Sequence, residues 1–229
     1  MMMSEPPGPR YREALSRDNA RRAAIALSRL GGVAKFSEIE RASGVRGSTL
    51  LHNLNILIQF GLVERLVKGT YGLRYLTPLC YIFSDKPLPI AYMGLLGRRE
   101  GREKPETETA LELLRAENIK PETIHVLTTH EAFDDWKEMR LQYDWILCYE
   151  DEIYDIDSVR EKVKRRWELL SKKYMLILDC TSATKPATIA YYEIAQTYQI
   201  PLIYIYEPTL KLKWLKSKET IKKEIIANR

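Results

Sequence analysis

Short apolar runs alternate with stretches of helical spacing along the C-terminal two thirds of the chain. Continuous apolar runs bounded by polar residues are typical of strands buried on both faces, and apolar residues three and four apart are typical of helices. Strands that alternate with helices predict an α/β fold with a mainly parallel sheet and right-handed crossovers. The expected strands are residues 90–96, 123–128, 145–149, 175–178 and 201–206, and the expected helices are residues 106–117, 131–139, 158–173 and 185–199.

The N-terminal third has a different pattern, in which three helices precede a tight hairpin. The order of elements is that of a winged helix-turn-helix, and the segment FGLVERLVKGTYGLRYLTP resembles the wing of ArsR- and MarR-like regulators. Gly31-Gly32 and Gly61 end two of these helices. The expected helices are residues 18–30, 37–44 and 48–60, and the expected strands are residues 62–67 and 71–76, joined by Lys68-Gly69-Thr70.

Proline marks the boundary between the two patterns. Ser84-Asp85-Lys86-Pro87-Leu88-Pro89 contains two prolines, which favour extended backbone and so predict a linker. The first ten residues are rich in Pro and Gly and predict a loosely attached tail. We therefore expect a flexible tail over residues 1–16, a winged helix-turn-helix domain over 17–84, a linker over 85–89 and an α/β domain over 90–229.

The positive charge of the chain lies in its first third. The 229 residues carry a formal net charge of +5. Residues 1–84 hold twelve Lys and Arg against six Asp and Glu, and the remainder holds 24 against 25. Such asymmetry indicates that the N-terminal domain meets a polyanion, although surface arginines can also serve only solubility.

The third expected helix carries the residues that we assign to DNA. Leu50, Leu51, Leu54, Leu57 and Ile58 form its expected buried stripe, which leaves small polar side chains for the major groove. Hydroxyl and amide groups can pair with base edges, and cations near the helix start and at the wing tip can contact phosphate. A winged helix used for protein contact or dimerisation is the alternative. The candidates for double-stranded DNA are Arg46, Ser48, Thr49, His52, Asn53 and Lys68.

A small polar loop follows the apolar run 175–178 and precedes the helix that Lys185 and Pro186 open. It lies where an open α/β sheet binds ligands, beyond the carboxyl ends of the strands. Free backbone N–H groups and the positive end of the helix dipole attract an anion there, and phosphate is the natural guest. Hydroxyls from Thr181, Ser182 and Thr184 can add hydrogen bonds. Alternatively, Thr184 or Ser182 only caps the helix and Lys185 is solvated.

The run Asp179-Cys180-Thr181-Ser182-Ala183-Thr184-Lys185-Pro186 resembles the signature loop of the CRISPR-associated Rossmann-fold sensor domain, called CARF. Ala183 stands where glycine is commoner in that pattern. The resemblance implies a Rossmann-like fold that binds cyclic oligoadenylate across the two-fold axis of a homodimer. It also implies that Thr181, Ser182, Thr184 and Lys185 face the ligand, with Asp179 and Ala183 in the same loop.

A second loop follows the first strand of the α/β domain. In a Rossmann-like sheet the first and fourth strands are neighbours, so this loop should lie close to residues 181–185. Its Gly97, Arg98 and Arg99 are therefore further candidates for the ligand site, with Arg102 beside them. A solvated charged loop is the equal alternative. The loop matches neither a dinucleotide fingerprint nor a phosphate-binding loop of the Walker type.

Composition excludes several other classes. No apolar run approaches the ~20 residues of a membrane helix, and no signal-peptide core is present, so a cytoplasmic protein without membrane contact is expected. Cys80, Cys148 and Cys180 are far apart among apolar neighbours, which predicts buried thiols. The histidines make no metal-binding spacing with them, so we expect neither a metal nor a cofactor.

The resemblance to CARF domains, taken together with the predicted winged helix, implies two possible functions. The first is a CRISPR-associated transcriptional regulator of antiviral defence, in which DNA binding by the winged helix responds to cyclic oligoadenylate, with cyclic tetra-adenylate as the first choice. The alternative is a metal-independent ring nuclease, in which a ribose 2′-OH attacks the adjoining phosphate and Lys185 stabilises negative charge. The first strand's loop lacks a hydroxyl residue until Thr107, which disfavours the nuclease. A dinucleotide-dependent enzyme is least favoured, because the fingerprints are missing.

Overall fold

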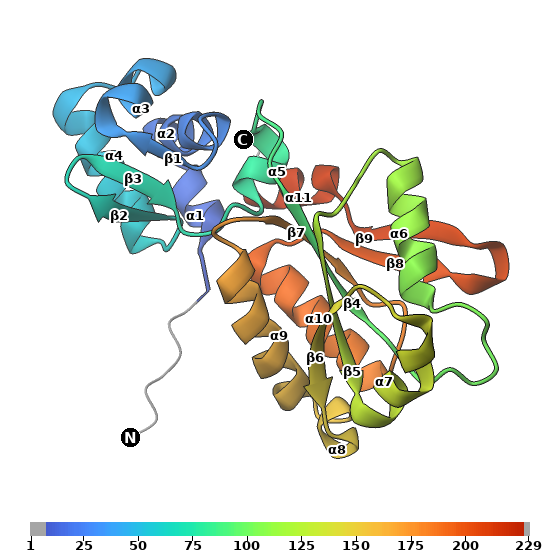
Figure 1. Cartoon of the computed structure of the whole chain (residues 1–229). Helices are drawn as coiled ribbons and strands as arrows, with labels where there is room; N and C mark the ends of the chain where they lie inside the picture. Colours follow the sequence, from blue (N-terminus) through green and yellow to red (C-terminus); the bar gives the residue numbers. More distant parts are fainter. Residues whose placement is uncertain (1–7, 227–229) are drawn as a thin grey trace, which may run out of the picture. The chain divides into compact units, whose positions relative to one another are not determined.

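The computed structural model describes residues 8–226, and its chain divides into two compact units (Figure 1). The first unit contains Met1–Leu88 together with Lys218–Arg229, and the second contains Pro89–Ser217. The first unit is therefore discontinuous in sequence. Residues 1–7 of the predicted flexible tail lie outside the described residues.

The first unit combines helices with a three-stranded antiparallel sheet in the order β1-β3-β2. Buried Ala20, Ala23, Ala24 and Leu27 form the inner face of the helix Asp18–Arg29, and small side chains there let neighbouring helices pack closely. The elements are α1 (Tyr11–Leu15), α2 (Asp18–Arg29), β1 (Val33–Lys35), α3 (Phe36–Ser43), α4 (Gly47–Gln59), β2 (Val63–Val67), β3 (Thr70–Leu73), α5 (Leu79–Phe83) and α11 (Lys218–Ile225).

Helix α1 corrects the prediction of a flexible segment up to residue 16. Tyr11 and Leu15 are buried, and the Arg10 N–H donates to the Phe60 carbonyl at 3.0 Å. The prolines and glycine before it suggested a tail, but the apolar side chains of α1 have a core to enter. Residues 10–15 are thus part of the folded unit.

Helix α11 corrects the assignment of residues 90–229 to one domain. Ile221 and Ile225 are buried in the first unit, and the Lys218 ammonium lies 5.8 Å from the centre of the Tyr81 ring on α5. The helical spacing of the segment indicates that one face is buried, but it does not indicate against which part of the chain. The C-terminal helix therefore completes the N-terminal unit.

The second unit is an α/β fold with a six-stranded sheet in the order β6-β5-β4-β7-β8-β9. All neighbouring pairs are parallel except β8 with β9. Numbered within the unit, this is the 3-2-1-4-5-6 order of a Rossmann sheet. The elements are β4 (Ile90–Leu95), α6 (Glu106–Ala116), β5 (Thr123–Thr129), α7 (His130–Trp136), η1 (Lys137–Met139), β6 (Asp144–Cys148), α8 (Glu150–Ile153), α9 (Ile156–Leu170), β7 (Met175–Asp179), α10 (Lys185–Tyr198), β8 (Leu202–Tyr206), η2 (Glu207–Thr209) and β9 (Lys211–Lys216).

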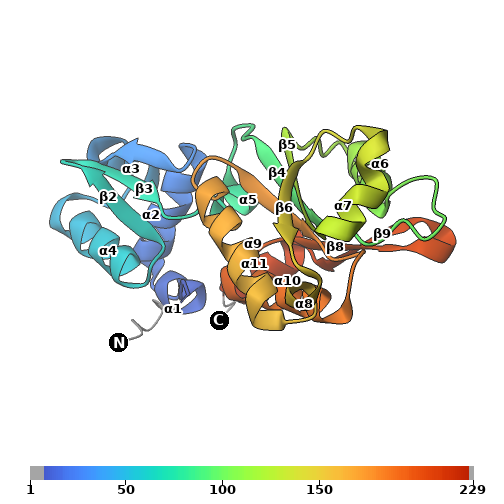
Figure 2. The same cartoon turned by 60° about the horizontal axis from the view of Figure 1, so that its bottom comes forward.

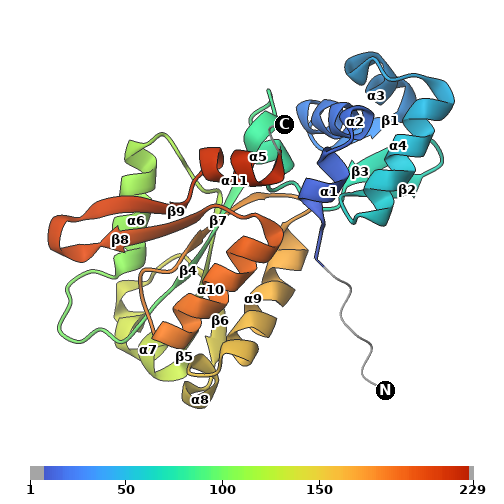
Figure 3. The ribbon, with the colours of Figure 1, turned by 180° about the vertical axis from the view of Figure 1, so that it is seen from behind.

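Helices cover both faces of this sheet (Figure 2). On one face, Tyr92 and Ile177 of the central strands pack in a core with Leu111 of α6 and Trp136 of α7. On the other, α9 and α10 lie side by side (Figure 3), and the Trp167 ring centre is 4.0 Å from that of Tyr198. The sheet is therefore enclosed, which explains why its strands are continuous apolar runs.

Candidate functional site

A cavity of about 360 Å³ opens at the carboxyl ends of the parallel strands of the second unit. Strand order reverses between β4 and β7, and this switch point is where an open α/β sheet forms a crevice. The loops after β4 and β7 meet there with α8 and the start of α7. The cavity is lined by Leu96, Gly97, Arg98, Glu100, Arg102, Glu106, Thr129, Ala132, Glu150, Ile153, Tyr154, Thr181, Ser182, Ala183, Thr184 and Tyr204.

Asp179, the last residue of β7, fixes the start of the loop between β7 and α10 through hydrogen bonds. Its Oδ1 accepts hydrogen bonds from the Thr181 N–H at 2.9 Å and the Thr181 hydroxyl at 2.5 Å, and its Oδ2 accepts from the Tyr92 hydroxyl at 2.5 Å. Asp179 is 1% exposed and does not line the cavity. This corrects its prediction as a ligand contact, because its carboxylate is used in shaping the loop.

Burial raises the pKa of Asp179 to about 6, although the hydrogen bonds from Thr181 and Tyr92 oppose this shift. The pKa of Tyr92 is raised well above its ordinary value, first by burial and then by the charge of Asp179. Both shifts favour the neutral forms of the pair. Burial therefore makes the ionised form of Asp179 less favourable than the ionised form of an exposed aspartate.

Backbone N–H groups of the loop are available to a ligand. In the described part of the chain, the N–H groups of Ser182, Ala183, Thr184 and Lys185 have no hydrogen-bond partner. They precede or open the 14-residue helix α10, whose N-terminus carries a partial positive charge. Ala183 adopts φ 70°, in the left-handed region that glycine adopts without strain. Successive N–H groups in such a turn form an anion-binding concavity.

The two predicted loops meet, as their strand positions led us to expect. The Gly97 N–H donates to the Ser182 hydroxyl oxygen at 3.3 Å. The Gly97 carbonyl accepts from the Trp136 indole N–H at 3.0 Å, and the Leu96 carbonyl accepts from the Thr128 hydroxyl at 2.8 Å. Hydrogen bonds to Ser182 of the second loop, to Trp136 of α7 and to Thr128 of β5 thus fix the backbone of the first loop.

The arginines of the first loop contact side chains of helices α6 and α7. Arg98 donates from Nε to Asp135 at 2.6 Å, and Arg102 lies 3.0 Å from Glu106. Arg99 lies outside the cavity lining, with its guanidinium 5.5 Å from the centre of the Trp136 ring. The lining contains two arginines and three glutamates, so its side chains supply no excess of positive charge. Recognition of a phosphate would therefore depend on backbone N–H groups and hydroxyls.

The threonines and the lysine of the signature loop have different positions. Thr184 caps α10 by accepting from the Ala187 N–H at 3.3 Å and donates to the Ile153 carbonyl at 2.7 Å. The Thr181 oxygen accepts from the Ile205 N–H at 2.9 Å. Both line the cavity, whereas the exposed Lys185 at the start of α10 does not. The capping role that we considered for Thr184 is present, and it leaves the four N–H groups before Ala187 unpartnered.

Several cavity residues were missed in the sequence. Thr129 is the last residue of β5 and Glu150 lies just after β6, so the rule that selected residues 181–185 could also have selected them. Tyr154 directly follows helix α8, in a stretch between the expected strand 145–149 and the expected helix 158–173 for which no element was expected. Tyr204 is inside a strand, and no local signal marks it.

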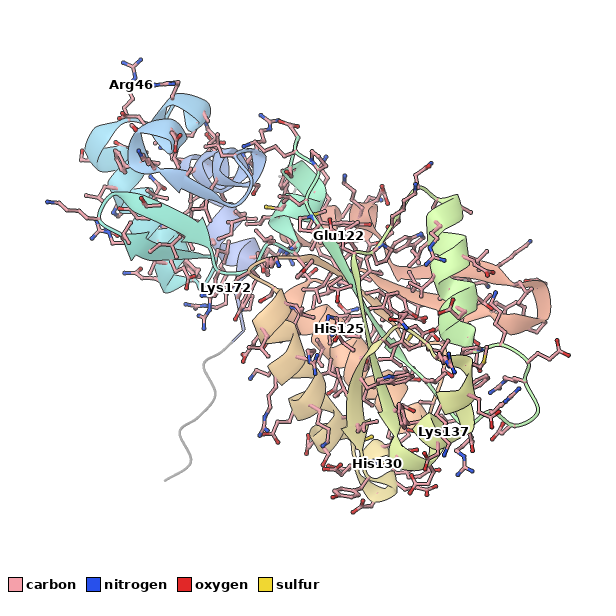
Figure 4. All side chains as sticks on the ribbon, viewed as in Figure 1. Arg46, Glu122, His125, His130, Lys137 and Lys172 are labelled. Atoms are coloured by element: carbon pink, nitrogen blue, oxygen red, sulfur yellow. The ribbon has the colours of Figure 1, made fainter. Side chains whose placement is uncertain are left out.

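The residues predicted to contact DNA lie in the first unit. Arg46, Ser48, Thr49, His52 and Lys68 are exposed, and Figure 4 shows the Arg46 side chain extending from the ribbon. Asn53 is a correction: it is 6% exposed, and its amide donates to the Thr49 carbonyl at 2.7 Å. Asn55 and Gln59 are the exposed side-chain amides on this helix.

Residues 8–226 contain no group of three or more His, Cys, Asp and Glu side chains that could hold a metal ion. The three cysteines are buried free thiols. Over the same residues, helices lack the length and apolar character needed to cross a membrane.

No family model and no curated protein matches the sequence. Solved structures that are similar include protein VC1899 from Vibrio cholerae, with 11% identity, a TM-score of 0.43 and coverage of 56% of this chain and 34% of that one. Can2 from Sulfobacillus thermosulfidooxidans, in complex with cyclic tetra-adenylate, has 14% identity and a TM-score of 0.43, covering 56% and 35%. Csm6 from Enterococcus italicus, bound to cyclic hexa-2'-fluoro-hexa-dAMP, has 12% identity and a TM-score of 0.43, covering 62% and 41%. The chain thus spans between a third and two fifths of their length.

Proposed function

We propose that the second unit binds a cyclic oligoadenylate in the cavity at the switch point. The observation that carries this proposal is the run of unpartnered N–H groups from Ser182 to Lys185 at the start of α10. Phosphate oxygens accept hydrogen bonds from such groups and are stabilised by the helix dipole. The resemblance of residues 179–186 to the CARF loop supplies the ligand class, with cyclic tetra-adenylate as the first choice.

The first unit, in this proposal, is a winged helix-turn-helix that binds double-stranded DNA. Its element order α2-β1-α3-α4-β2-β3 and its sheet order β1-β3-β2 support this interpretation. Helix α4 presents Ser48, Thr49 and His52, which can reach base edges in a major groove. Arg46 and Lys68 supply cations for phosphate, in a chain segment with a net positive charge.

Regulation requires that the ligand favour one conformation of the protein over another. We propose a homodimer in which one ring contacts both second units, because a cyclic ligand with repeated nucleotides suits a two-fold axis. Binding would then shift the population between dimer geometries with different affinities for DNA. By linkage, DNA would change the affinity for the ring by the same factor.

Incubation with cyclic tetra-adenylate tests this proposal, with binding followed by calorimetry and products by chromatography. We expect the ring to bind and to remain intact, and gel shifts of DNA to differ with and without it. Linear products would make the protein a ring nuclease instead. Failure to bind rings of four or six adenylates would contradict the ligand assignment.

Ser182→Ala tests whether the loop after β7 contacts the ring. The substitution removes the acceptor of the Gly97 N–H and a hydroxyl of the cavity. We expect weaker binding of the ring. Ser158→Ala is the control, because this hydroxyl lies at the start of α9 and bonds to Asp155.

A further inference from the structure

Two tyrosines line the cavity on either side of the loop that follows β7. Tyr154 follows α8 and is 60% exposed, and Tyr204 lies within β8 and is half-buried. Among residues 8–226, neither ring packs against another aromatic ring or a cation, and neither hydroxyl has a hydrogen-bond partner. Two other exposed tyrosines do make such contacts: the Tyr149 ring lies 5.5 Å from the His130 ring, and the Tyr206 ring lies 5.1 Å from the Lys213 ammonium.

The loop itself positions both tyrosines. The Thr184 hydroxyl donates to the carbonyl of Ile153, the residue before Tyr154, at 2.7 Å. The Thr181 oxygen accepts from the N–H of Ile205, the residue after Tyr204, at 2.9 Å. The backbone beside each ring is therefore bonded to the same turn that carries the unpartnered N–H groups.

The segment that carries Tyr154 is further fixed at both ends. The Glu152 carboxylate accepts from the Tyr149 N–H at 2.7 Å and lies 3.1 Å from the Lys162 ammonium. Asp155 caps α9 by accepting from the Ser158 N–H at 2.8 Å. An exposed aromatic ring on a fixed backbone binds a flat ligand with little loss of conformational entropy.

A nucleotide ligand needs a surface for its base as well as a place for its phosphate. Aromatic side chains stack on nucleobases, and every base has a face that can stack. We propose that Tyr154 and Tyr204 are the base-contacting residues of this site, each stacking on an adenine whose phosphate lies on the N–H groups of residues 182–185. This inference rests on the proposed function. It assigns base recognition to α8 and β8, outside the signature loop.

Fluorescence of a ring with one adenine replaced by 2-aminopurine tests the proposal, since stacking quenches this base. The full chain is compared with Tyr154→Ala and Tyr154→Phe. Because alanine removes the ring, we expect affinity to fall roughly 5- to 150-fold and quenching to weaken. Phenylalanine keeps the ring, so affinity and quenching should stay at the wild-type level. Tyr204→Phe and Tyr204→Leu repeat the comparison at β8.

Tyr149→Ala is the matched control, because this tyrosine is 68% exposed and does not line the cavity. Its substitution should leave binding unchanged. If wild type binds the ring and Tyr154→Ala binds equally well, stacking by Tyr154 is wrong while the ligand assignment stands. If Tyr154→Phe loses as much affinity as Tyr154→Ala, the hydroxyl and not the ring contacts the ligand. If wild type binds no ring, the ligand assignment fails and this inference falls with it.

Discussion

Tyr92 on β4 donates a hydrogen bond to Asp179 at the end of β7, with 2.5 Å between Oη and Oδ2. The two strands are parallel neighbours at the point where strand order reverses. The other oxygen of the same carboxylate accepts from Thr181. A single buried acid therefore joins the centre of the sheet to the loop that lines the cavity.

Asp179→Asn should change the pH dependence of stability. The pKa of Asp179 is about 6 in the folded protein and 3.8 ordinarily, so folding favours the protonated form. Stability from this group is fully present below pH 3.8 and is lost as pH rises through 6, by up to about 3 kcal/mol. Urea unfolding at pH 4 to 7.5 should show wild type losing stability relative to Asp179→Asn. Parallel curves for the two proteins would contradict this expectation.

The comparison with Asp179→Asn also cancels the contribution of His125, which makes the protein more stable as pH rises. Burial lowers the pKa of His125, whose ring nitrogens lie 3.0 Å from the Thr123 hydroxyl and 3.1 Å from Arg166. Stability from the neutral ring is present at neutral pH and is lost as pH falls below 6.5. Because both proteins retain His125, this effect cancels in their difference.

Arg46→Ala with Lys68→Ala should weaken DNA binding. If each side chain contacts one phosphate, the slope of log K against log salt should decrease in magnitude by about 1.8. Gel shifts or fluorescence anisotropy at several salt concentrations measure this slope. Lys137→Ala is the control for charge, because Lys137 is an exposed lysine of the second unit (Figure 4). An unaltered slope in the double variant would move the phosphate contacts elsewhere.

Asn53→Ala and Asn55→Ala should have different effects. Asn53 is buried with its amide on the Thr49 carbonyl, so its loss should lower stability by about 1 kcal/mol. Asn55 is exposed on α4, so its loss should weaken binding to specific DNA while stability stays unchanged. Thermal unfolding and DNA binding of both variants separate the two roles. Reversed results would place the buried face of α4 against DNA.

Ile221→Ala should damage the unit at the other end of the sequence. Ile221 is fully buried in the first unit, and a large-to-small change in a core costs about 2–5 kcal/mol. We expect DNA binding to be lost at lower temperature than in wild type, while binding of the ring by the second unit persists. Lys223→Ala, an exposed neighbour, is the control. Equal losses of both activities would contradict the assignment of α11 to the first unit.

Periodicity in the sequence was sufficient for the five parallel strands of the second unit, and strand order was sufficient for the meeting of its two loops. The predicted strand 175–178 and the loop after it are β7 and one wall of the cavity, because apolar runs and strand order follow general rules. The charged groups were harder to predict. Arg98 is bonded to Asp135, a residue 37 positions away whose position depends on the tertiary fold.

Helix α4 shows how a local error arises. We expected Leu51 and Ile58 to be buried and Asn53 to be exposed, whereas Leu51 is 40% exposed and Asn53 is buried. Residues 50, 53, 54 and 57 follow the spacing of a helix face, so the position of Asn53 was readable. Spacing along the helix decides which face a residue occupies, and the polarity of its side chain does not.

The return of α11 to the first unit has a consequence for synthesis on the ribosome. The chain segment from Met1 to Leu88 leaves the ribosome before Pro89–Ser217, but it lacks Ile221 and Ile225, which belong to its core. All of Pro89–Ser217 must be translated before that core can close. Domains whose residues are contiguous can fold in order of synthesis, N-terminal first. Here the second unit can fold as soon as Ser217 has been synthesised, whereas the first unit can finish folding only after α11 has been synthesised.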